Sequence, residues 1–219
     1  TAVRSQDVSI STCGQVVPAR ASAVVANDIT CDPTEPFVVQ IEDRGSLDLS
    51  GFTLSGGKRG VKCVRKCSVG SSVGTGTIRD SGAGINAPSK VLVSNVALEN
   101  NQYGVLGDFR RTQVRGEQVT ITGGGFGIQA SLVRIKGLTV TGSAPGLQVR
   151  RAVLDGCQIT GCTFDAIRGG SARLANCTLS GNDPVDLELL GRPRLVNSTC
   201  ERSRRLSNPV EDWGVCTND

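Results

Sequence analysis

The feature that most constrains this chain is a repeat of about 21 residues that runs through most of its length. Short segments that alternate apolar and polar residues recur at intervals of 19 to 24 residues. Their first residues are Asp28, Gly51, Thr75, Asn95, Gln118, Gly137, Gly156, Asn176 and Asn197. A fixed period of this size is typical of solenoids, in which each repeat packs only against its neighbours.

Three apolar columns run through the repeat. The fourth residue of each segment forms the first column: Cys31, Leu54, Ile78, Leu98, Ile121, Val140, Ile159, Leu179 and Cys200. A second column precedes the segments by two residues: Leu49, Val73, Val93, Ile135, Leu154, Leu174 and Leu195. A third follows the segments: Val38, Val61, Ile85, Val105, Ile128, Leu147, Ile167 and Leu187. Because side chains alternate along a strand, the columns predict three short strands per repeat with inward apolar residues.

Three short strands per repeat fit neither a helix bundle nor a doubly wound sheet. We therefore predict an all-β fold, a single-stranded parallel β-helix (solenoid) of about nine coils over residues 26–200, with coils about 4.8 Å apart. Residues 1–25 and 201–219 depart from the repeat, and we expect them to cap the two open ends. Glycine precedes five residues of the third column, which indicates a turn that needs backbone freedom; these are Gly60, Gly84, Gly104, Gly127 and Gly146.

The stretch Gly45–Gly56 reads Gly-Ser-Leu-Asp-Leu-Ser-Gly-Phe-Thr-Leu-Ser-Gly. It is similar to a repeat of bacterial parallel β-helix proteins. On this motif and the period, residues 26–200 resemble right-handed parallel β-helix proteins of the pectate-lyase-like superfamily. The resemblance implies a right-handed coil and a polysaccharide as the default ligand, but it says little about activity.

Composition excludes several functional classes. The 219 residues include no histidine, which rules out histidine triads and histidine-ligated zinc or haem. No run of about 18 apolar residues is present to form a membrane-spanning helix. The net charge of +4 does not favour a nucleic-acid module, and 19 of the 24 basic residues are arginine, whose planar fork suits carboxylate, sulfate and phosphate partners.

Nine cysteines without methionine indicate an exported protein, extracellular or periplasmic, whose disulfides form in an oxidising compartment. A start at Thr1 without an apolar leader is expected of a mature form. We predict the pairs Cys13–Cys31, Cys63–Cys67, Cys157–Cys177 and Cys200–Cys216, which leaves Cys162 unpaired. The first and last pairs would close the caps. Cys157 and Cys177 share an inward column in adjacent coils, where two stacked free thiols would fit equally well.

The strand after the glycine turn carries the first candidate binding surface. Its outward residues, one per coil, are Lys62, Asn86, Leu106, Gln129, Gln148, Arg168 and Glu188, and Asp108 and Arg150 lie two residues further along. A row of amide and guanidinium donors would bind hydroxyls and carboxylates of an extended acidic glycan. The superfamily resemblance implies a saccharide groove along this kind of face. The alternative interpretation is an ordinary solvated strand.

The strand before each segment carries a second set of charges. Arg115, Arg134, Arg173 and Arg194 repeat at one outward position, and Glu117, Lys136 and Asp155 follow two residues later in successive coils. Alternating charges one coil apart favour a salt-bridged ladder with a structural role. The sharper alternative makes Lys136 a base beside carboxylates that hold calcium, as in some lyases.

Tyr103 is the third candidate. It begins a Tyr-Gly-apolar turn similar to the Tyr-Gly-Phe-Asp-Pro-His-Asp motif of mannuronan epimerases, whose tyrosine and histidine transfer protons. Here Leu106 stands at the position of the first aspartate and Asp108 at that of the histidine, so half of the acid–base pair is missing. We expect Tyr103 to pack under the turn, at the position also held by Phe126.

Two minor signals remain. Asn176 and Asn197 begin glycosylation-type Asn-x-Thr triplets, but both occupy a repeated turn position where a ladder of side-chain amides would form. Thr120 with Thr122 and Thr139 with Thr141 form outward Thr-x-Thr rows similar to those of some antifreeze proteins. The charged residues Arg79, Glu99 and Glu201 interrupt that outer column.

From these observations we expect a secreted, monomeric β-helix protein that binds or scaffolds acidic polysaccharide, without a clear catalytic set. The alternative is a polysaccharide lyase or epimerase acting on uronate-containing glycans, with Tyr103, Lys136 and Arg168 as catalytic residues. Calcium would be the cofactor of such a lyase, and otherwise no cofactor or metal is expected. An ice-binding protein is the third hypothesis.

Overall fold

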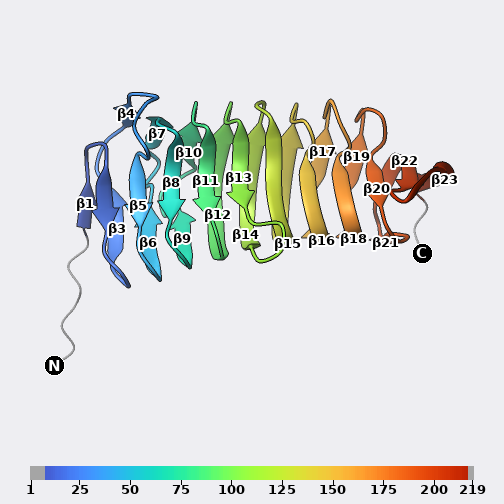
Figure 1. Cartoon of the computed structure of the whole chain (residues 1–219), viewed down its shortest axis with the longest axis horizontal. Coiled ribbons are helices and arrows are strands. Elements are labelled where there is room, and N and C mark those ends of the chain that lie inside the picture. The colour runs from blue at the N-terminus through green and yellow to red at the C-terminus, as the bar shows by residue number, and fades with distance from the viewer. Residues whose placement is uncertain (1–7, 217–219) are drawn as a thin grey trace.

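The computed structural model describes residues 8–216, which form an all-β solenoid of about ten turns. Its coils stack along the long axis from β1 to β22, as the blue-to-red progression in Figure 1 shows. Parallel pairing between successive coils generates three sheet faces, named here faces A, B and C. Within the described residues the fold contains no helix, so none that could cross a membrane.

Face A is built from ten strands or strand segments paired in parallel. Its separate strands are β1 (Val8–Ile10), β3 (Ser22–Val25), β6 (Gly45–Asp48), β9 (Cys67–Gly70) and β21 (Arg194–Val196). The remaining five are parts of longer strands that bend round a corner of the coil: β12 (Lys90–Glu99), β14 (Gln113–Thr122), β15 (Phe126–Thr141), β16 (Leu147–Asp155) and β18 (Ile167–Ala175).

Faces B and C complete each coil. Face B contains β4 (Ile29–Cys31), β7 (Thr53–Gly56), β10 (Gly76–Arg79), β17 (Gln158–Thr160), β19 (Thr178–Ser180), the ends of β12, β14 and β15, and the start of β22 (Thr199–Arg205). Face C contains β2 (Gln15–Val17), β5 (Val39–Ile41), β8 (Arg59–Cys63), β11 (Ala83–Ala87), β13 (Tyr103–Gly107), β20 (Leu187–Leu189), the starts of β15, β16 and β18, and the end of β22.

The predicted inward columns fill the interior from Ile78 onward. Ile78, Leu98, Ile121 and Val140 stand in register and are at most 1% exposed. Four column members are wrong in the first coils. Ile29 pairs with Leu54 instead of Cys31, and Val39 pairs with Val61 instead of Val38. In the second column, Leu47 and Val69 hold the positions predicted for Leu49 and Val73. Val73 is 65% exposed, because the longer early repeats place extra loop residues between the strands.

The corner between faces A and B has a left-handed backbone at the first residue of the predicted segments. Gly51, Asn95, Gln118, Gly137, Gly156, Asn176 and Asn197 all have positive φ values, a conformation that glycine and asparagine adopt most readily. At this corner Asn197 Nδ2 donates to Asn176 Oδ1 at 3.5 Å, which is one step of the predicted amide ladder. The next step differs, because Gly156 has no side chain and Asn176 Nδ2 donates to Asp155 Oδ1 at 2.9 Å.

The five glycines that precede the residues of the third column have a different role from the one predicted. None of the five has a positive φ value, so backbone freedom does not explain them. A Cβ atom at Gly104 would lie 2.5 Å from the carbonyl oxygen of Gly127, and one at Gly127 would lie 2.1 Å from that of Gly146. These positions require glycine because the backbones of successive coils approach closely there.

The disulfides match the pairs expected from the sequence. Bonds join Cys13 to Cys31, Cys63 to Cys67, Cys157 to Cys177 and Cys200 to Cys216, and Cys162 is a buried free thiol. Cys157 and Cys177 lie in adjacent coils with their Cα atoms 4.4 Å apart. Burial raises the pKa of Cys162 to about 11, so this thiol stays protonated and unreactive near neutral pH.

The ends of the solenoid differ from the expected boundaries. β1 and β3 already pair in parallel on face A, so coils begin at Val8 instead of residue 26. Parallel pairing also continues into β22, where Leu187 pairs with Ser203. The C-terminal covering strand is β23 (Asn208–Cys216), which runs antiparallel to β22 and packs the partly buried Trp213 against the core. Residues 1–7 and 217–219 of the expected caps lie outside the described residues.

Candidate functional site

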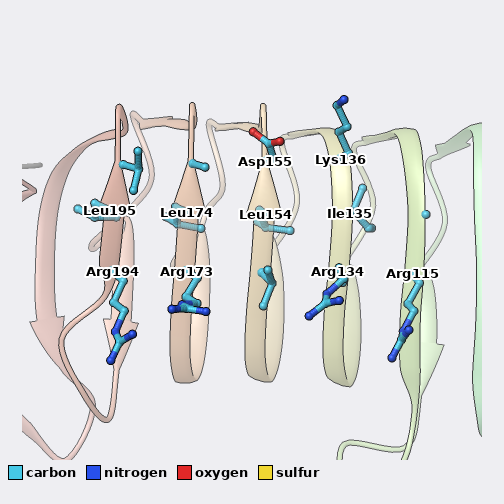
Figure 2. Close-up of a pocket in the computed structure, with 14 residues that line it drawn as sticks. Arg115, Arg134, Ile135, Lys136, Leu154, Asp155, Arg173, Leu174, Arg194 and Leu195 are labelled. Atoms are coloured by element: carbon cyan, nitrogen blue, oxygen red, sulfur yellow. The ribbon is translucent and has the colours of Figure 1, made fainter. Parts of the chain in front are cut away.

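A groove of about 790 Å3 lies along face A, over the coils of β14, β15, β16, β18 and β21. Figure 2 shows arginines along one margin of this groove and the side chains of Lys136 and Asp155 along the other. Between the margins, Ile135, Leu154, Leu174 and Leu195 point inward, so strand backbone and aliphatic groups form the floor. We call this feature the arginine groove.

The arginine margin is a row of side chains in register. Arg115 pairs with Arg134, Arg134 with Val153, Val153 with Arg173, and Arg173 with Arg194. Neighbouring members of such a row stand about 4.8 Å apart at their backbones. Like charges directly opposite each other across strands are destabilising, so this row is not explained by stability.

Among the side chains that the structure describes, those of residues 8–207 and 213–216, none of these four arginines forms an ion pair with a carboxylate. Arg134, Arg173 and Arg194 are exposed. Arg115 is half-buried; its Nη2 donates to Gln113 Oε1 at 3.3 Å, while its buried Nε has no partner. The row therefore presents uncompensated guanidinium groups to the groove.

The opposite margin does not form the expected salt-bridged ladder. Lys136 stands in register between Glu117 and Asp155, as the alternating pattern predicts. However, no ion pair within 4.0 Å joins Lys136 to either carboxylate in the described chain, and in Figure 2 its side chain points away from the groove. Asp155 instead accepts a hydrogen bond from Asn176 Nδ2 at 2.9 Å.

The N-terminal half of face A continues the same outward row with different chemistry. Ser22, Ser46 and Ser68 stand in register, and Leu92 connects this row to Arg115. These serines line a second groove of about 550 Å3. Ser46 Oγ donates to Ser22 Oγ at 3.0 Å, so neighbouring hydroxyls satisfy each other. We call this part of face A the serine half, and the coils of the arginine groove the arginine half.

The first predicted surface, on face C, is a continuous row in the structure. Lys62, Asn86, Leu106, Gln129, Gln148, Arg168 and Glu188 pair in successive coils. Several members already have partners within the protein. Lys62 Nζ lies 5.3 Å from the centre of the Phe37 ring, and Asn86 Nδ2 donates to the Leu106 carbonyl at 3.4 Å.

The two flanking residues of the face C row differ from each other. Asp108 shapes its own turn, since its Oδ1 accepts from the Arg110 amide at 2.7 Å and its amide donates to Thr112 Oγ1 at 2.8 Å. The Arg150 side chain is exposed, and it makes no hydrogen bond or ion pair with the side chains that the structure describes. Of the two, only Arg150 is therefore free to meet a ligand on this face.

The C-terminal end of the face C row contains a buried charge network that sequence reasoning missed. Arg168 Nε lies 3.0 Å from Glu188 Oε2, and Arg204 Nη2 lies 2.8 Å from Glu188 Oε1. Arg204 Nη2 also lies 4.0 Å from Oδ1 of Asp165, which is 1% exposed. Burial, together with the neighbouring Glu188, raises the pKa of Asp165 to about 7. Asp165 lies in a turn, where no repeat pattern marks it.

Tyr103 packs as expected for a turn aromatic. Its ring stacks on that of Phe126, with centroids 5.0 Å apart and planes 10° apart. The two residues stand in register in adjacent coils of face C.

The three candidate catalytic residues do not converge. Tyr103 and Arg168 belong to face C, three coils apart along the row, whereas Lys136 belongs to face A. The described residues also contain no group of three or more acidic or cysteine side chains suited to hold a metal ion. The calcium-assisted arrangement around Lys136 therefore has no counterpart among residues 8–216.

The threonine rows on face B are in register but short. Thr120 pairs with Thr139 and Thr122 with Thr141, while Glu99 occupies the outer row beside Thr122 and Arg79 stands beside Glu99. The interruption expected from the sequence is therefore present in the structure.

Comparison of the chain with models of known protein families, with curated proteins and with solved structures found no match in any of the three. The resemblance to the pectate-lyase-like superfamily therefore stays a prediction from the sequence.

Proposed function

We propose that this protein binds an extended acidic polysaccharide along the arginine groove of face A. The observation that carries the proposal is the row formed by Arg115, Arg134, Arg173 and Arg194, which faces the groove without a carboxylate partner in the described chain. The proposal moves the binding surface from face C, where we expected it, to face A.

The electrostatics of the row favour a polymer of anions over a single anion. Each guanidinium offers a planar fork that pairs with carboxylate or sulfate. Neighbouring guanidinium groups repel one another until an anionic ligand neutralises them. The binding free energies of several weak contacts along one polysaccharide chain also add, because each later contact forms within a complex that already exists.

The shape of the groove favours a saccharide among linear polyanions. The groove runs across successive coils, so its ligand is expected to lie along the solenoid axis in an extended conformation. Its lining includes strand backbone and the aliphatic side chains of Val153, Ala175 and Val196, which suit the C–H faces of sugar rings. It has no aromatic residue on which a nucleic-acid base could stack. Four disulfides are compatible with an extracellular setting, where acidic glycans are abundant ligands.

Binding requires no proton-transfer pair, which fits the separation of Tyr103, Lys136 and Arg168. A lyase or epimerase remains the alternative. It would need catalytic groups gathered at one point of the groove, and Lys136 is the one expected catalytic residue that lines it.

The first experiment is a binding panel on the intact, oxidised protein. Calorimetric titrations with alginate, pectate, chondroitin and heparan should show binding, and neutral dextran and duplex DNA of matched charge should bind weakly or not at all. Ultraviolet absorbance of the unsaturated elimination product, followed in the same mixtures with and without calcium, should stay flat. A rising absorbance would support the lyase. Tighter binding of DNA than of the acidic glycans would identify the groove as a nucleic-acid surface. Absence of binding to every glycan would refute the proposal.

A further inference from the structure

Glu188 occupies an outward position of the face C row, yet it is only 4% exposed. Arg168 in the preceding coil and Arg204 in the following coil contact its two carboxylate oxygens, and both arginines are in register with it. A buried ion pair of this kind adds little to stability after its desolvation cost. Its clearer consequence is geometric, because the ion pair holds the Arg168 side chain toward Glu188 Oε2, a buried atom that has no hydrogen-bond partner among the described residues.

The guanidinium of Arg168 is half exposed although Glu188 is buried. Its side chain is 45% exposed, and Nε is the atom that faces Glu188. Its two terminal amino groups have no hydrogen bond or ion pair within residues 8–216. The network therefore presents the free end of the guanidinium fork to solvent in a defined orientation.

A pocket of about 200 Å3 has Arg168 in its lining. It is lined by Phe126, Phe164, Pro145, Gln148 and Arg168, together with Ala144 and Asp165. Phe164 is 53% exposed, so its ring is accessible to a ligand. The pocket thus combines two aromatic rings, one side-chain amide and one oriented guanidinium. Its volume is below the roughly 300–1,000 Å3 of pockets that hold drug-sized ligands.

We propose that this pocket is a second binding site, which takes a carboxylate carried on a single six-membered ring. The terminal amino groups of Arg168 pair with the carboxylate, the Gln148 amide hydrogen-bonds a neighbouring polar group, and the ring lies against Phe126 and Phe164. Two sources share this chemistry, an aromatic acid and the uronic acid unit of a glycan. The site uses none of the residues of the arginine groove, so it does not depend on the function proposed for face A.

The charge balance of the network supports an anionic ligand. Arg168 and Arg204 face one ionised carboxylate, Glu188, as long as Asp165 carries its proton. Asp165 is neutral below about pH 7, because burial and Glu188 raise its pKa. The cluster then has one net positive charge. The charged groups that face Asp165 are Glu188 of β20, Arg204 of β22 and Arg168 of β18.

The test is an NMR titration of the isotopically labelled, oxidised protein with benzoate, with glucuronate and with uncharged glucose. We expect benzoate or glucuronate to bind and glucose not to bind, with shifts confined to the Phe126, Gln148 and Phe164 region. Arg168→Gln should weaken binding at least tenfold, since it removes a charge-assisted contact. Phe164→Ala should weaken it several-fold. Arg20→Gln, which removes an exposed arginine in the first coils and outside the pocket, is the matched control and should have no effect.

Glu188→Gln tests the positioning role separately. It keeps the guanidinium but removes the carboxylate that orients it, so affinity should fall while the Arg168 side-chain signals broaden; a thermal melt verifies that the variant is folded. Arg134→Gln with Arg173→Gln should leave ring-acid binding unchanged, which separates this site from the polymer site. Failure of both acids to bind, or equal affinity in Arg168→Gln and the native protein, would refute the second site.

Discussion

The two halves of face A have the same backbone and opposite surface chemistry. In the serine half, Ser22, Ser46 and Ser68 occupy the outward row, and the Ser46 hydroxyl donates to that of Ser22. In the arginine half, the same row carries four guanidinium groups without carboxylate partners in the described chain. The inward residues of both halves are aliphatic and buried. The difference teaches that the solenoid constrains its inward positions strictly and leaves its outward positions free for binding.

The largest effect should come from an inward change in the arginine half. Leu174→Ala removes a side chain that is 2% exposed in the core column and should cost about 2–5 kcal/mol of unfolding free energy. Arg173→Ala, at the adjacent outward position, should change stability by less than about 0.5 kcal/mol. Urea unfolding of the two variants measures both values. A comparable loss in both would contradict the separation of inward from outward roles.

A pH-dependent effect should appear in the coils of the arginine half. The pKa of Asp165 is raised on folding, so the folded state binds a proton more tightly than the unfolded chain does, and stability falls as pH rises from about 4 through about 7. Asp165→Asn removes this loss. At pH 8 it should raise Tm, and the free energy of unfolding should rise by at most about 4 kcal/mol. Near pH 4 it should leave Tm almost unchanged. A gain in Tm that is equal at both pH values would show that Asp165 is not protonated in the fold.

Binding of acidic polymer should depend on one half of the face and not on the other. Arg134→Gln combined with Arg173→Gln should weaken polyuronate binding about 100-fold, since two charge-assisted contacts are lost. Ser46→Ala combined with Ser68→Ala should have no measurable effect. Calorimetry with alginate or pectate at low salt is the measurement, and the serine variant is its control. Equal losses in the two variants would place the ligand across the whole face.

The smallest effect should come from extending the row toward the serine half. Leu92 is 43% exposed and stands in register with Arg115, so Leu92→Arg adds a fifth guanidinium to the row. Affinity for the polymer should rise about three- to tenfold. Thr141→Arg, which adds the same charge to face B, should raise it much less. An equal gain in both variants would show that net charge, and not the row, determines binding.

The sequence predicts much of this architecture and less of its chemistry. The repeat predicts the solenoid, the stacking of Cys157 on Cys177 and the alignment of Arg115 with Arg134, because every coil repeats the same inward packing and period. The first coil is missed since β1 and β3 lie outside the recognisable period. The ion pairs expected around Lys136 do not form among the described side chains, because register aligns the charges but does not fix the side-chain conformations. The Asp165 network depends on contacts between three coils and a turn, which no local pattern encodes.

The most direct test of the central claim is the salt dependence of polyuronate binding by the native protein and by a variant with all four groove arginines changed to glutamine. Binding that depends on several guanidinium–anion contacts should weaken steeply as salt rises, because each contact releases or screens counterions. We predict a steep dependence for the native protein and, for the variant, weak binding with a nearly flat dependence. An unchanged affinity and slope in the variant would show that the arginine groove is not the binding site.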